Sequence, residues 1–103
     1  MDAECVALCE AMNLVPGIRT TESCCGHNEH EYRVFFNTES LEALPPLLYW
    51  FDGCHSGCYG WKVIVRTDCG CSPAYFYVEG PTGQRSYDDA KIIAERIVKD
   101  NTK

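Results

Sequence analysis

The sequence has no long hydrophobic run, because no uninterrupted stretch of apolar and aromatic residues is longer than five. A transmembrane helix needs about 20 consecutive apolar residues, so a membrane span is not expected. The first residues also lack the basic segment and following apolar stretch of a secretory signal. We therefore expect a cytoplasmic protein, in the host cytoplasm if the source is viral.

Basic residues are few and scattered. The chain has nine Lys and Arg against fifteen Asp and Glu, which gives a net charge of −6. Nucleic-acid binding depends on a basic face that displaces counterions from phosphates, so nucleic acid is not expected as a partner. A small anionic ligand is compatible with this composition, because backbone N–H groups and one or two arginines can hold it.

The sequence contains eight cysteines and three histidines in 103 residues but no Cys-x-x-Cys pair. Many cysteines in a short chain indicate a disulfide framework when the protein is secreted. Without a secretory signal, reduced thiols or metal ligands are favoured instead. The length suits one hydrophobic core, so residues 1–103 are expected to form a single domain.

Three segments have the apolar spacing of amphipathic helices. The first covers residues 2–14. The second covers residues 40–51, where we expect a turn capped by Ser40 and then a helix starting near Pro45, because proline is tolerated only in a first helical turn. The third starts at Ser86, whose hydroxyl would cap it, and ends near residue 99. The side chains expected to face the core are Cys5, Leu8, Cys9 and Met12 in the first helix and Ile92, Ile93, Ile97 and Val98 in the last.

The segments rich in β-branched and aromatic residues predict four strands, at 18–23, 32–37, 61–67 and 74–79. Residues 52–60 contain three glycines and predict a loop. The order is one helix, then strand, strand and helix twice. This order predicts an α+β domain with a four-stranded, mainly antiparallel sheet and helices on one face.

Chain direction in such a sheet decides which loops meet. If the first strand runs up, the turn at residues 24–30 lies at the top, and the chain returns to the top through a helix before the third strand begins. We therefore expect the cysteine- and histidine-containing segments 24–30 and 54–58 to meet at one end of the sheet. The turn at 68–73, with Cys69 and Cys71, is expected at the opposite end.

The side chains at the shared end are candidate zinc ligands, because thiolate and imidazole are the groups that zinc prefers. Four of them converging from two loops would make a closed structural site. The alternative is that the thiols pack as small hydrophobic groups and the histidines are solvated. The candidate metal ligands are Cys24, Cys25, His27, His30, Cys54, His55 and Cys58.

The residues at this end of the sheet also suggest two other functions, an anion-binding site and a nucleophilic cysteine. A glycine at a strand end lets backbone N–H groups converge on an anion, while hydroxyls add donors and aromatic rings stack on a base. A thiol of Cys24 or Cys25 beside His27 is a candidate nucleophile for a cysteine-dependent activity. The candidate ligand-binding residues are Arg19, Thr20, Thr21, Ser23, Cys24, Gly26, His27, Tyr59 and Trp61.

Parts of the chain resemble a known family. Residues 16–27 are similar to the Ser-Cys-x-Gly-Arg motif of the wybutosine-synthesising tRNA methyltransferases, and residues 61–65 and 74–81 to that family's Trp-led and Phe-x-Glu-Pro strands. His27 stands where the family has arginine. Residues 16–27 also resemble small uncharacterised bacterial and phage proteins with a Ser-Cys-x-Gly-His turn. The first resemblance implies a reduced methyltransferase that uses S-adenosylmethionine.

Taken together, the residues favour a small cytosolic binding module over an enzyme. Its anionic or nucleotide-like ligand is expected at the turn of residues 20–30 and the loop of residues 54–61, with zinc supporting the loops. A bacterial or viral accessory protein that sequesters a nucleotide signal would fit the size and acidity. The alternatives are the methyltransferase-like enzyme and a zinc-stabilised interaction domain, and exposed aromatics at 49–51 favour a homodimer.

Overall fold

A computed structural model describes residues 2–66 and 75–102 and confirms the α+β fold. The predicted turn at 68–73 lies outside these residues. In chain order, the elements are α1 (Ala3–Met12), β1 (Ile18–Cys24), the 3₁₀ turn η1 (Gly26–Asn28), β2 (Glu31–Thr38), the 3₁₀ turn η2 (Leu41–Ala43), α2 (Leu44–Phe51), α3 (Gly53–Ser56), β3 (Lys62–Arg66), β4 (Tyr75–Thr82) and α4 (Gln84–Asn101).

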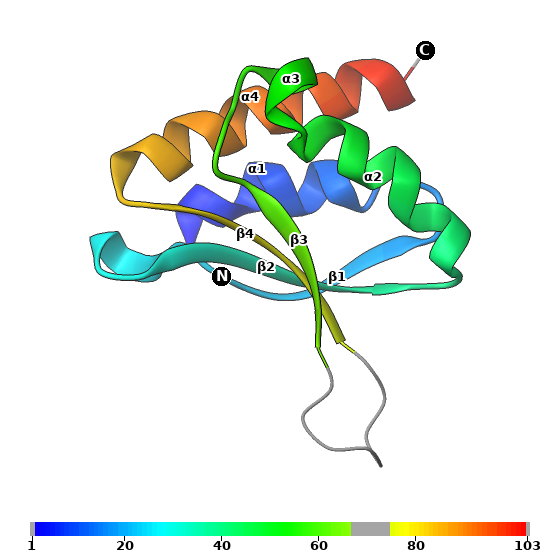
Figure 1. Cartoon of the computed structure of the whole chain (residues 1–103), viewed down its shortest axis with the longest axis horizontal. Coiled ribbons are helices and arrows are strands. Elements are labelled where there is room, and N and C mark those ends of the chain that lie inside the picture. Colours follow the sequence, from blue (N-terminus) through cyan, green and yellow to red (C-terminus); the bar gives the residue numbers. More distant parts are fainter. Residues whose placement is uncertain (1, 67–74, 103) are drawn as a thin grey trace.

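The four strands form one antiparallel sheet in the order β1-β2-β4-β3, and the helices of the described chain lie on one of its faces (Figure 1). One row of paired residues crosses the whole sheet, from Cys24 through Arg33 and Glu79 to Lys62. The end of β1 and the start of β3 therefore lie at the same end of the sheet, as predicted.

The core lies between the sheet and the helices, because alternate residues of each strand point to opposite faces. Tyr32, Val34 and Phe36 of β2 are buried, and α1 and α4 lie above this sheet (Figure 1). The predicted apolar stripe of α1, including Cys5 and Cys9, is fully or almost fully buried. None of the helices in the described residues has both the length and the apolar character needed to cross a bilayer.

The inward face of α4 is narrower than predicted. Ile93 and Ile97 are buried, but Ile92 and Val98 are 41% and 40% exposed, because a helix that packs on one side buries only a stripe. The helix also starts earlier, at Gln84. Ser86 is therefore not a cap but a buried residue of the first turn, and its hydroxyl donates to the carbonyl oxygen of Gly83 at 2.6 Å.

Residues 40–60 differ from prediction in two details. The turn before the proline-containing helix and the helix itself are confirmed, but Ser40 makes no side-chain capping hydrogen bond. The predicted loop at 52–60 contains the short helix α3. The carboxylate of Asp52 accepts the N–H of Cys54 at 3.0 Å, and Gly57 ends the helix with a positive φ of 79°.

Trp61 is a core residue rather than a ligand-binding platform. Its side chain is 8% exposed and packs edge-on against Tyr32, with ring centroids 5.3 Å apart. The indole N–H donates to a carboxylate oxygen of Asp89 at 3.1 Å. Trp61 also lies over Gly80, where a Cβ atom would come within 2.6 Å of the ring.

Because of this contact, we expect a substitution of Gly80 by a residue with a Cβ atom to destabilise the fold. We expect Gly80→Ala to lower the free energy of unfolding by about 1–3 kcal/mol, because the buried indole cannot yield to the added methyl group. Gly53→Ala is the matched control. Its Cβ would meet the ring of Tyr59, which is 61% exposed, so we expect rotation of this side chain into solvent to relieve the contact. Urea denaturation of both variants tests this, and equal effects would contradict it.

Candidate functional site

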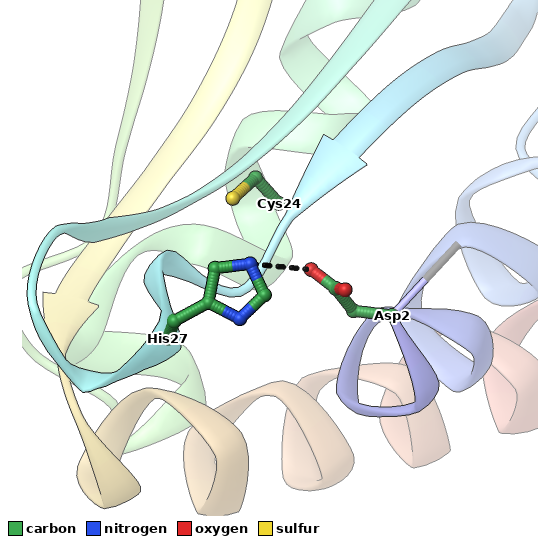
Figure 2. Close-up of side chains that lie close together, drawn as sticks. All are labelled: Asp2, Cys24 and His27. Atoms are coloured by element: carbon green, nitrogen blue, oxygen red, sulfur yellow. Dashed lines mark ion pairs between the residues drawn. The ribbon is translucent and has the colours of Figure 1, made fainter.

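Three side chains from separate parts of the chain come together beside the turn between β1 and β2. Asp2 precedes α1, Cys24 ends β1, and His27 lies in η1. One ligand atom from each residue lies within 4.8 Å of the others, and Figure 2 shows the three side chains pointing toward a common space. In the described residues, this is the one group of three or more metal-binding side chains at such distances.

Asp2 links the start of α1 to this turn. It occupies the N-cap position of α1 but makes no side-chain bond to its own helix. Instead, Oδ2 accepts the backbone N–H of Cys25 at 3.0 Å. This hydrogen bond, more than any other interaction, lowers the pKa of the Asp2 carboxyl below its usual value, which favours the ionised form that binds a metal.

The backbone of the turn is held in an unusual conformation. Gly26, His27 and Asn28 all have positive φ values, of 79°, 50° and 66°. For the two residues with a Cβ atom, this conformation costs roughly 1–2 kcal/mol each, and such strain concentrates at functional sites. The turn brings Nε2 of His27 to 3.9 Å from Oδ2 of Asp2.

Chemistry and spacing make the group compatible with zinc. A thiolate, an imidazole and a carboxylate are all zinc ligands. Two atoms bound tetrahedrally to one zinc ion lie about 3.3–3.6 Å apart. The 3.9 Å between His27 and Asp2 is close to this value, and both side chains reach solvent. Three protein ligands leave the fourth coordination position open.

The other predicted metal ligands do not join this group. Sγ of Cys25 lies 3.8 Å from Nδ1 of His27, but the Cys25 side chain is buried at 3% exposure. His30 follows the turn and is exposed. The remaining three lie on or beside α3: Cys54 is exposed, His55 contacts Asp52 at 3.1 Å, and Cys58 is buried.

Most of the predicted ligand-binding side chains do not lie at the turn between β1 and β2, or their polar groups are engaged elsewhere. Arg19 is at the opposite end of β1, five residues from Cys24 and hence roughly 16 Å away. Thr20 exchanges two hydrogen bonds with Asn13, at 2.8 and 3.0 Å. Thr21 is exposed, whereas the hydroxyl of Ser23 is buried against α1 beside Cys5.

Tyr59 and Trp61 do not complete a cradle at the turn either. Tyr59 is exposed, and its carbonyl oxygen accepts a hydrogen bond from Arg85 at 2.7 Å, while Trp61 is buried. Gly26 does allow a close backbone approach, because a Cβ there would lie 3.1 Å from the carbonyl oxygen of Glu31. The N–H of Cys25, which the cradle would offer to an anion, is taken by the carboxylate of Asp2.

Asp2 is the site residue that the sequence did not predict. An acid just before a helix is explained by the helix dipole alone, so nothing in the pattern separates it from an ordinary N-terminal acid. Only the packing of α1 across the sheet brings residue 2 beside residues 24–27. This packing also supplies the carboxylate beside His27 that sequence patterns could not identify.

Comparisons with models of protein families, with curated proteins and with solved structures found no match to this chain. The resemblance to the wybutosine-synthesising methyltransferases, and the S-adenosylmethionine chemistry that it implies, therefore stay predictions.

The six described cysteines are free thiols in two contrasting environments. Among these six, we expect iodoacetamide to modify Cys24 and Cys54 first in the native protein, because both are exposed. Burial raises the pKa of the Cys5, Cys9 and Cys58 thiols, which lowers their thiolate fraction as well as their accessibility. Peptide mapping by mass spectrometry, with a chelator present, tests this order. Early labelling of Cys5 or Cys9 would contradict the packing of α1.

Proposed function

We propose that this protein is a cytoplasmic zinc-binding module in which Asp2, Cys24 and His27 hold the ion. The single observation that carries the proposal is the convergence of three ligand atoms of different chemistry within 4.8 Å of one another. Zinc would tie the start of α1 to the turn between β1 and β2. The site would then stabilise the sheet end where the first hairpin closes.

Two features of the turn support a binding role over chance proximity. Asp2 forgoes the usual bond to its own helix and is oriented by Cys25 instead, which fixes the carboxylate before any ion arrives. The strained conformation of His27 is maintained in a side chain that is exposed and is held by contacts to Cys25 and Asp2. A bound ion would add a further contact that stabilises this conformation.

The open coordination position gives the module a way to bind a small anionic ligand. The backbone donor of the turn is already used by Asp2, so the anion would bind to the metal rather than to the N–H of Cys25. A phosphate or carboxylate oxygen is a suitable fourth ligand for zinc. This arrangement retains the anionic ligand expected from the sequence but makes its binding depend on zinc.

We expect the purified protein to bind one zinc ion per chain, measured by elemental analysis and by competition with a chromophoric chelator. Asp2→Asn, Cys24→Ala and His27→Ala should each weaken zinc binding at least about tenfold, since loss of even an outer-shell partner has an effect of that size. The Asn variant keeps an oxygen for the N–H of Cys25, so it separates metal binding from the hydrogen bond. Any affinity tag belongs at the C-terminus, away from Asp2.

The matched controls are Cys54→Ala and His55→Ala, which remove an exposed thiol and imidazole outside the group. Both should bind zinc as the unchanged protein does. Substoichiometric zinc in the unchanged protein, or equal losses in the controls, would overturn the proposal. Cobalt in place of zinc should give a thiolate charge-transfer band that disappears in Cys24→Ala.

Zinc should also stabilise the fold. At a free zinc concentration of a hundred times the dissociation constant, the free energy of unfolding should rise by about 2.7 kcal/mol, because only the folded chain brings residues 2, 24 and 27 together. Thermal unfolding with zinc and with a chelator measures this rise. Added phosphate should change the cobalt spectrum if the fourth position is open, whereas an unchanged spectrum would identify a purely structural site.

A further inference from the structure

A second candidate site is lined by residues of α2, α3 and α4. A cavity of about 440 Å³ is bounded by the ends of α2 and α3 and by the C-terminal half of α4. This volume lies in the range of about 300–1,000 Å³ that is typical of small-molecule sites. None of the three proposed zinc ligands lines it, so this cavity is separate from the zinc site.

The aromatic wall of the cavity is formed by Tyr49. Its side chain is 51% exposed, and its ring lies 4.3 Å from that of His55 and meets Trp50 edge-on at 6.2 Å. These two neighbours hold the ring in place while leaving part of it accessible. A positioned and partly exposed ring is what stacking on a planar ligand requires.

The opposite wall carries two cations from one face of α4. Arg96 and Lys99 are three residues apart, so they are neighbours on the helix surface. Neither forms an ion pair within the described residues, although the chain has a net charge of −6. Two adjacent unpaired cations at a cavity are suited to an anionic group such as phosphate.

The acids at the cavity have different environments. Asp100 accepts the indole N–H of Trp50 at 2.7 Å, so one of its oxygens is already engaged. Glu95 also lines the cavity and has no ion-pair partner within the described residues. A free carboxylate in this position accepts hydrogen bonds from hydroxyl or amino groups.

We propose that this cavity binds a nucleoside monophosphate. The base stacks on Tyr49, the phosphate binds Arg96 and Lys99, and the carboxylate of Glu95 accepts hydrogen bonds from the ribose hydroxyls. A ring, an anionic group and neutral donors occur together in this ligand class, and all three match groups on the cavity wall. A free anion without a ring would leave Tyr49 unused.

The probe is adenosine monophosphate, measured by isothermal titration calorimetry and by chemical-shift changes of the protein in the presence of a chelator. We expect saturable binding, with the shifted resonances in α3 and in residues 92–100. Tyr49→Ala should weaken binding roughly fivefold or more, the size of one lost base–aromatic stack. Arg96→Gln should also weaken binding, and adenosine or inorganic phosphate alone should bind less tightly than the nucleotide.

Lys91→Gln is the matched control, because Lys91 is an exposed cation of the same helix that does not line this cavity. It should bind the nucleotide as the unchanged protein does. Lack of binding at millimolar nucleotide, or equal weakening in the control, would overturn the inference. An unchanged affinity in Tyr49→Ala, or chemical-shift changes confined to residues 2 and 24–27, would also overturn it. If the protein binds the nucleotide but does not bind zinc, the result contradicts only the proposed function.

Discussion

The structure depends on the burial of one face of a four-stranded antiparallel sheet. Tyr32, Val34 and Phe36 on β2 and Val78 on β4 point to the same face and are almost completely covered by helices. To cover them, the chain places α1 and α4 side by side above the sheet (Figure 1). Everything that sits at the ends of these helices is positioned by that requirement.

One consequence is the group of Asp2, Cys24 and His27. α1 can bury its stripe only by lying against β1 and α4, and this places the start of the helix at the end of β1. Tyr32 reinforces the arrangement, because its buried hydroxyl donates to the carbonyl oxygen of Glu4 at 2.7 Å. The candidate metal site is thus built by packing of the core, although its ligands are on the surface.

A second consequence is the separation of the two cysteine- and histidine-containing segments. The last residue of β1, Cys24, and the first residue of β3, Lys62, lie in the same row of paired residues across the sheet. However, Asp52 caps α3, which joins α2 directly and lies over α4. His55 therefore lies beside the C-terminal half of α4 rather than η1. The seven candidate metal ligands are consequently divided between two separate surfaces, and we propose a metal site on one of them and a nucleotide site on the other.

The α+β class, the order of the elements and the buried stripe of α1 can all be predicted from the amino-acid sequence, because they follow from local periodicity and chain direction. It could not predict Asp2 as a site residue, α3, or the exposure of Ile92 and Val98. Asp2 looks like any acid before a helix until residues 2 and 25 are brought together by packing across 23 positions of chain. Tertiary structure decided the candidate site because side-chain proximity between distant segments depends on how the helices cover the sheet, which no local pattern records.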